Sequence, residues 1–155
     1  METTLSIQKL AEAANLSRWQ IDQWISRGHF KPEHTPEAGK ARTFTIEDAL
    51  ILGTLAELVR LGITPTVGSM HVNHVYTFAD DMALLVITQS PMGLAPPKGD
   101  EKPAQFHHPQ NFATHSQVVR SRDLLKIATD PQVRSMAVVN ISEVEKRVLS
   151  VAEHN

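Results

Sequence analysis

The chain has 155 residues, of which 41% are hydrophobic and 21% charged, and its formal net charge is −2. This composition suits a soluble globular protein of one domain, or of a small domain with an appendage, and no apolar run approaches the roughly 20 residues of a membrane helix. The chain has no cysteine, which excludes disulfides and thiolate metal sites and is typical of cytoplasmic proteins. Residues 1–4 lack the cationic start and the apolar segment of a signal peptide, so we expect a cytoplasmic location and no membrane partner.

Two short helices joined by a tight turn are predicted near the N-terminus. Ser6 is a candidate N-cap, and apolar residues follow it at the helical spacing i, i+3, i+4 and i+7: Ile7, Leu10, Ala11 and Ala14. Asn15 tolerates the left-handed conformation and is expected to end this helix. Ser17 and Gln20 have the spacing of a capping box, which predicts a second helix that ends at Gly28. Such a pair predicts a helix-turn-helix, whose second helix can enter the major groove of DNA.

The second predicted helix has an apolar stripe, formed by Ile21, Trp24 and Ile25, and an opposite polar face. Side chains on the polar face can read base edges, because arginine pairs with guanine and glutamine pairs with adenine. Asp22 adds a carboxylate to this face. The residues of this helix that we expect to contact DNA are Ser17, Arg18, Trp19, Gln20, Gln23 and Arg27.

A basic stretch, residues 30–44, follows the second helix. Prolines and a glycine mark a polar loop in its middle, and residues 40–44 alternate polar and apolar side chains as in a short strand. We interpret this stretch as a two-stranded wing in which Phe30 and Phe44 face inward. The side chains expected on the phosphate backbone are Lys31, Lys40 and Arg42. A solvated hairpin with ordinary surface charge remains the alternative.

The charge balance of the predicted DNA-binding part favours two copies over one. From residue 18 to residue 42 there are five cations and three anions among Asp, Glu, Lys and Arg, which gives a charge of +2. A patch of this size binds phosphates weakly from a single subunit, and a symmetric dimer would double it.

The order of these elements resembles the MerR-like winged helix-turn-helix family. The matching residues are Leu16-Ser17 at the start of the second helix, Gly28 and Pro32 after it, and Arg42-x-Phe44-Thr45-x-x-Asp48 before the next helix. The resemblance covers about the first 65 residues. It implies a transcriptional regulator that binds double-stranded DNA as a homodimer, with Gln20 and Arg42 near the DNA. The chain departs from the family where Asp22-Gln23-Trp24 replaces Arg-Tyr-Tyr, so the family gives little guidance on the operator sequence.

Helices and strands alternate beyond the basic stretch. Thr45 and Asp48 have capping-box spacing for a helix over residues 46–61, which is apolar nearly all round and is therefore expected to pack on two sides. A helix is expected over residues 65–81, with proline at its first position. Further elements are strands at 82–88, 117–119 and 136–140, a Pro-rich loop at 90–109, and helices capped by Ser121 and by the box Ser142-x-x-Glu145.

These elements predict an α+β fold with two regions. Residues 1–64 form the winged helix-turn-helix DNA-binding domain, and residues 65–155 form a small α/β region. The second region suits a dimerisation module or a compact sensor, and its sequence does not choose between them. A small-molecule or protein effector at this C-terminal region is left open.

Chemistry other than DNA binding has little support in the sequence. Histidines at positions 71, 74, 107, 108 and 115 invite a metal site, but no carboxylate or thiol is clearly spaced with them, so we expect neither a metal nor a cofactor. The sequence has no phosphate-binding glycine loop and no nucleophile elbow, so we expect no enzyme. Two alternatives to a transcription factor stay open: a helix-turn-helix module for protein interaction or assembly, as in phage or adaptor proteins, and a ligand-sensing regulator.

Overall fold

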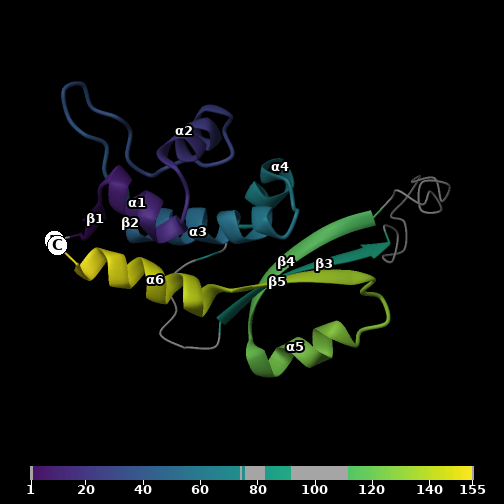
Figure 1. Ribbon diagram of the computed structural model, residues 1–155. Coiled ribbons are helices and arrows are strands. Elements are labelled where there is room, and N and C mark those ends of the chain that lie inside the picture. Colours follow the sequence, from purple (N-terminus) through teal and green to yellow (C-terminus); the bar gives the residue numbers. More distant parts are fainter. Residues whose placement is uncertain (1, 74, 76–82, 92–111, 155) are drawn as a thin grey trace.

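The computed structural model describes residues 2–73, 75, 83–91 and 112–154. A helical part and a sheet part follow each other along the chain (Figure 1). The helical part consists of β1 (Thr4–Leu5), α1 (Ile7–Ala14), α2 (Arg18–Ser26), β2 (Phe44–Thr45), α3 (Ile46–Arg60) and α4 (Pro65–Ser69). The sheet part consists of β3 (Ala83–Pro91), β4 (Phe112–Arg120), α5 (Ser121–Ala128), β5 (Ser135–Asn140) and α6 (Ile141–Glu153).

The turn between α1 and α2 forms as predicted. Ser6 caps α1 by accepting a hydrogen bond from the backbone N–H of Lys9 at 3.3 Å. Asn15 adopts the left-handed conformation, with φ of 52°, and the N–H of Leu16 then donates to the carbonyl of Ala11 at 3.0 Å. These bonds satisfy the backbone groups that the end of α1 leaves open, and they fix the start of α2 relative to α1.

Helix α3 lies between other helices, as its all-round apolar composition predicted. Its buried residues include Leu50, Leu52, Leu55 and Leu58, each 0% exposed. It contacts α1 and α4, and it also contacts α6 from the far end of the chain. The predicted capping box is present, because Thr45 and Asp48 each accept a hydrogen bond from the backbone N–H of the other.

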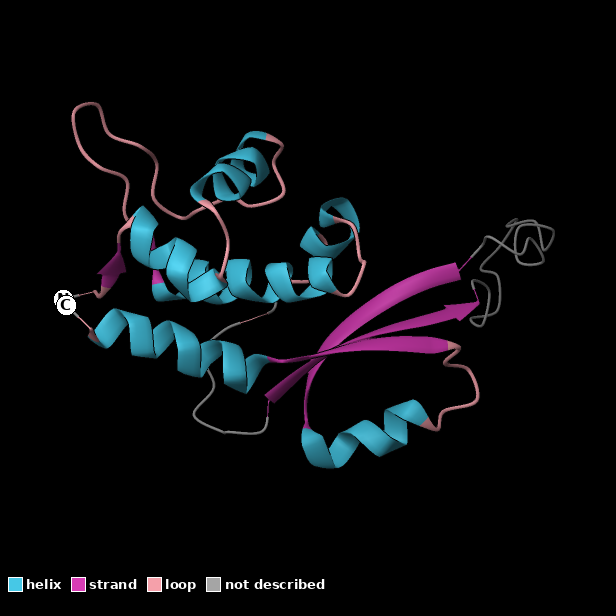
Figure 2. Ribbon diagram, viewed as in Figure 1, coloured by secondary structure: helices cyan, strands magenta, loops and turns pink. Residues whose placement is uncertain are grey.

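The two-stranded wing predicted within residues 30–44 is not formed. Figure 2 shows a long loop between α2 and β2, and β2 pairs instead with β1, with Phe44 opposite Leu5. Pro32 and Pro36 lack the N–H groups that a hairpin ladder needs, and the N-terminal strand supplies the partner for Phe44. Phe30 and Phe44 do face inward, each at 1% exposure.

The helix predicted over residues 65–81 is much shorter than expected. α4 ends at Ser69 and turns follow it, so the prediction was wrong for residues 70–73. Gly68 is a weak helix former, and the tight turn after it brings Val72 and Val75 into the core, at 1% and 3% exposure. Residues 74 and 76–81 of the predicted helix lie outside the described residues.

Strand β3 is the centre of a three-stranded antiparallel sheet with the order β4-β3-β5. Val86 of β3 lies opposite Gln117 of β4 and Val138 of β5, which sets the register of both pairs. The three strands predicted from the sequence are present, and β3 and β4 extend beyond the predicted ends. An antiparallel sheet that follows a largely helical N-terminal part confirms the α+β class. Most of the predicted Pro-rich loop, residues 92–109, lies outside the described residues.

The starts of α5 and α6 differ from the predictions. Ser121 is the first residue of α5. The N-cap of this helix is Arg120, whose side chain makes no cap hydrogen bond. α6 is capped by Asn140, whose side chain accepts a hydrogen bond from the N–H of Glu143 at 3.2 Å. Ser142 is buried in the first turn, and its Oγ accepts a hydrogen bond from the N–H of Ala83 at 3.0 Å. The serine predicted to cap a helix therefore joins α6 to β3.

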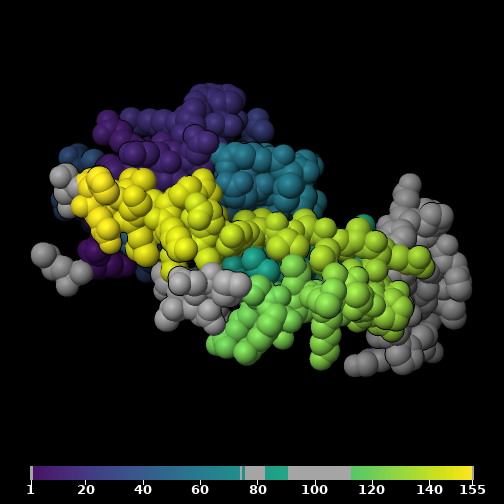
Figure 3. Space-filling model, turned by 60° about the horizontal axis from the view of Figure 1, so that its bottom comes forward, coloured from purple at the N-terminus to yellow at the C-terminus, as the bar shows by residue number. Residues whose placement is uncertain are grey.

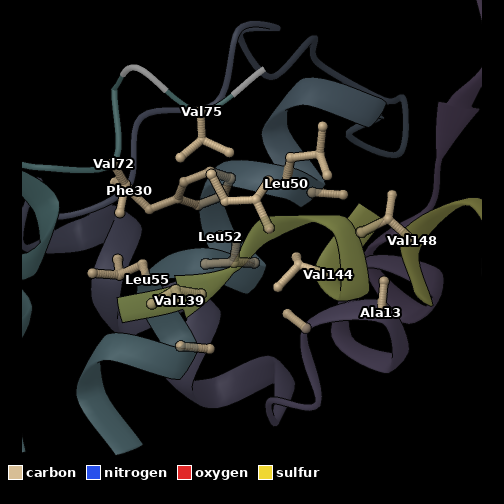
Figure 4. Packing of buried hydrophobic residues seen from close by; sticks show 14 of the residues in the cluster. Ala13, Phe30, Leu50, Leu52, Leu55, Val72, Val75, Val139, Val144 and Val148 are labelled. Atoms are coloured by element: carbon tan, nitrogen blue, oxygen red, sulfur yellow. The ribbon is translucent and has the colours of Figure 1, made fainter. Parts of the chain in front are cut away.

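Helix α6 returns to the helical part and packs against α1 and α3. Figure 3 shows it alongside the segment of α3 and α4, and Figure 4 shows Val144 and Val148 within the cluster that holds Leu52 of α3 and Ala13 of α1. The approach to α3 is close at Gly53, where an added Cβ would lie 2.8 Å from Cγ1 of Val144. One hydrophobic core therefore includes residues from both the helical and the sheet part.

Candidate nucleic-acid interface

Helix α2 presents a polar face to solvent. Ile21 and Trp24 are buried against the core, which fixes the opposite side outward. Trp19 is 68% exposed and can contact a partner. Gln23 is half-buried, and the remaining predicted contacts on this segment are exposed: Ser17, Arg18, Gln20 and Arg27. These side chains can reach a partner, and their contact with DNA stays a prediction.

Gln20 has a structural role that limits how it can read a base. Its Oε1 accepts a hydrogen bond from the backbone N–H of Ser17 at 3.0 Å, and Ser17 Oγ lies 3.2 Å from the same oxygen. A paired contact with adenine uses both the amide oxygen and the amide nitrogen of glutamine. Gln20 must therefore share or release its cap bond to read adenine in this way.

Arg18 and Asp22 form an ion pair one helical turn apart. Arg18 Nε lies 3.9 Å from Asp22 Oδ2, and the two side chains are 72% and 63% exposed. Pairs this exposed contribute about 0–1 kcal/mol, so Arg18 is easily released to a phosphate or to guanine. Asp22 keeps a negative charge beside it.

The loop after α2 holds its three predicted phosphate-binding cations in different ways. Lys31 is exposed, and Lys40 is paired with Glu37 at 2.6 Å. Arg42 is half-buried, its Nε donates to the carbonyl of His34 at 3.2 Å, and its guanidinium lies 5.8 Å from the ring centroid of Phe44. Arg42 thus shapes the loop as well as offering charge.

A groove of about 350 Å³ brings the helix and the loop together. It lies between the start of α1, α2 and the end of the loop, and Arg18, Asp22 and Arg42 line it. The structure therefore places the arginines predicted from two separate segments around one space. Two guanidinium groups around a groove suit the oxygens of a phosphate.

Arg60 supports the helix-turn-helix, a role that was not predicted from the sequence. Its Nη2 donates to the carbonyl oxygens of Ala14 and Asn15, at 3.1 and 2.8 Å, so it holds the turn between α1 and α2. In the sequence it is only a cation in the last turn of a helix, and its partners lie 45 and 46 residues earlier. No local spacing signals such a contact.

Comparison with known families agrees with this architecture. Residues 5–67 match the family described as MerR HTH family regulatory protein. This segment is a MerR-like helix-turn-helix domain. The match supports a DNA-binding role in transcription regulation, and the MerR-like domain includes α1, α2, the loop, α3 and the start of α4. No curated protein matches the chain.

Neither a metal site nor a membrane span is found among the described residues. Within these residues, His, Asp and Glu side chains form no group of three or more that could hold a metal ion. His71 is buried, and its Nε2 lies 3.0 Å from Thr114 Oγ1, while residues 74, 107 and 108 lie outside the described part of the chain. No helix in the described part is long and apolar enough to cross a bilayer.

Proposed function

We propose that the chain is a sequence-specific transcription regulator that binds duplex DNA as a homodimer in the cytoplasm. α2 lies in the major groove and the loop between α2 and β2 lies along the phosphate backbone. The observation that carries the proposal is the exposed polar face of α2 within a segment that matches MerR regulators. The proposed DNA contacts are Ser17, Arg18, Trp19, Gln20, Gln23, Arg27, Lys31, Lys40 and Arg42.

The proposal of a dimer rests on charge and symmetry. One copy offers a net charge of +2 over residues 18–42, which is small for a specific complex, and two copies reading two half-sites double it. In the proposed division of roles, residues 1–64 bind DNA, and residues 65–155 pair the subunits or bind an effector.

Variants of α2 should lose sequence specificity once the operator is known from selection of bound genomic fragments. Arg18→Ala should weaken binding to that operator by roughly 5–150-fold, because a paired base contact contributes about 1–3 kcal/mol. Gln20→Glu should keep the capping box, since glutamate serves the same cap, and should change the preferred base. Fluorescence anisotropy with operator and scrambled duplexes measures both effects.

Arg122→Ala is the matched control for charge, because this exposed arginine lies on α5, outside the groove. It should bind the operator as the unmodified chain does. Equal operator affinity for Arg18→Ala, Gln20→Glu and Arg122→Ala would rule out α2 as the reading helix.

Asp22 favours the second candidate function, a helix-turn-helix module that binds protein. It sets a carboxylate on the exposed face of α2, in a chain whose net charge is −2. If the face binds DNA, Asp22→Asn should tighten binding to any duplex by about 2–5-fold at low salt, equivalent to roughly 0.5–1 kcal/mol. Unchanged or weaker DNA binding, together with no enriched genomic fragment at moderate salt, would favour the protein-binding module.

A further inference from the structure

A second cleft lies at the seam between the helical part and the sheet part. It has a volume of about 440 Å³, within the range of small-molecule sites. The C-terminal end of α3 forms one side, and the end of β5 with the first turns of α6 forms the other. Its apolar wall includes Leu61, Val138 and Val144, and Leu61 is 61% exposed.

The polar side of this cleft holds two arginines on one carboxylate oxygen. Glu57 Oε1 accepts from Arg60 Nη1 at 2.7 Å and from Arg147 Nη2 at 2.9 Å. Three charged groups that meet in this way carry a net positive charge. Arg60 has further bonds to the turn between α1 and α2, whereas the bond to Glu57 is the one hydrogen bond of the Arg147 side chain within the described part of the chain.

Arg147 is incompletely satisfied. Its Nε is buried and has no hydrogen-bond partner among the described residues, which is an unfavourable state for a charged donor. Nε and one Nη form a planar edge that matches the two oxygens of a carboxylate. A rotation of this side chain that releases its single bond to Glu57 would present that edge to a ligand, while Arg60 continues to neutralise Glu57.

We propose that this cleft binds a small monocarboxylate with an apolar body. The carboxylate pairs with Arg147, and the body lies against Leu61, Val138 and Val144. Glu143 also lines the cleft and is exposed, so a second negative charge on the ligand would meet repulsion there. The chemistry therefore favours one carboxylate over two, and a ligand without a carboxylate leaves the planar edge of Arg147 unpaired.

The cleft has a short physical connection to the candidate DNA-binding surface. Arg147 and Arg60 share Glu57, and Arg60 holds the carbonyls of Ala14 and Asn15 at the turn before α2. A ligand that takes Arg147 from Glu57 changes the charge balance on Arg60 and thus the hold on this turn. An effect of the ligand on DNA affinity rests on the proposed function, whereas its binding to the cleft does not.

The test uses the full chain without DNA and three probes that share a phenyl group. In methyl and amide NMR titrations, 3-phenylpropionate should produce saturable shifts at Leu61, Val138 and Val144. Phenethylamine has no carboxylate and phenylsuccinate has two. The affinity of each should be lower than that of 3-phenylpropionate by roughly tenfold or more. No saturable shift with 3-phenylpropionate at millimolar concentration, or equal binding of phenethylamine, would overturn the proposal.

Variants identify the group that holds the carboxylate. Arg147→Met keeps the apolar stem of the side chain without the guanidinium, and it should weaken the binding of 3-phenylpropionate by roughly tenfold or more. Arg147→Lys keeps the charge without the planar edge and should also weaken it. Arg122→Met removes an exposed arginine outside the cleft and should bind as the unmodified chain does. Unweakened binding by either Arg147 variant would exclude the assignment, and the comparison of probes on the unmodified chain decides the ligand class independently of variant folding.

Discussion

Truncation after Asn140, which removes α6, should leave the MerR-like domain without a cooperative thermal transition. α6 supplies three buried side chains to the core shared with α1 and α3, Ile141, Val144 and Val148, each at most 1% exposed. Burial of one such side chain contributes about 1.5–3 kcal/mol, so the three contribute roughly 5–9 kcal/mol. That sum approaches the whole stability of a typical domain, about 5–15 kcal/mol. Circular dichroism and calorimetry of the two chain lengths measure the effect.

Two point variants separate loss of packing from the general effect of shortening the chain. Val148→Ala should lower the free energy of unfolding by about 1–3 kcal/mol, because it removes buried methyl groups and leaves space behind. Leu149→Ala alters the next residue, which is 39% exposed, and should change the stability by less than about 0.5 kcal/mol. If the truncated chain melts at the temperature of the full chain, α6 does not stabilise the helices.

The helix-turn-helix could be predicted from sequence because its signals are local. Ser6, Asn15 and the pairs Ser17–Gln20 and Thr45–Asp48 act within three or four residues of their partners. Local alternation also suggested a wing, but the strand partner of Phe44 is Leu5, almost forty residues away. A much larger separation along the sequence hides the contact of α6 with α1. Ser142 shows that a local signal can also mislead. It has the spacing of a helix cap, but its Oγ accepts a hydrogen bond from Ala83 of β3 instead.

The sequence predicted which residues form the candidate site better than it predicted how their side chains are held. The amphipathic pattern of α2 indicated most of the exposed side chains correctly, although Gln23 is half-buried. It could not show that the oxygen of Gln20 is engaged in the helix cap, or that Arg42 donates to the carbonyl of His34. It also gave no sign that Arg60 and Arg147 meet on Glu57, because the residues that join there come from helices 90 positions apart. Side-chain hydrogen bonds and ion pairs of this kind depend on tertiary contacts, which the local sequence pattern does not show.

Asp48→Ala should destabilise the chain by roughly 2–5 kcal/mol and loosen the loop after α2. Asp48 is 4% exposed, and its two carboxylate oxygens accept from different segments: Oδ2 from the N–H of Thr45 at 3.0 Å and Oδ1 from the N–H of Glu33 at 3.1 Å. Alanine leaves both donors without their acceptor. An unsatisfied buried donor, here the N–H of Thr45, costs about 1–3 kcal/mol, and the N–H of the exposed Glu33 adds less. The bond to Glu33 is also the link that ties the loop to the start of α3, so amide exchange should rise through residues 31–43. Urea unfolding and hydrogen exchange measure the two effects.

Glu47→Ala and Asp48→Asn make this prediction specific. Glu47 is exposed in the same helical turn, so its loss tests the acidic first turn alone and should cost at most about 1 kcal/mol. Asparagine at position 48 keeps one acceptor oxygen and replaces the other with a donor, which cannot serve both N–H groups. Its stability should therefore fall between those of Asp48→Ala and the unmodified chain. Equal losses for Glu47→Ala and Asp48→Ala would mean that helix charge, and not the two bonds of the buried carboxylate, sets the stability of this junction. In that case the loop that carries Lys31, Lys40 and Arg42 would not depend on α3 for its position.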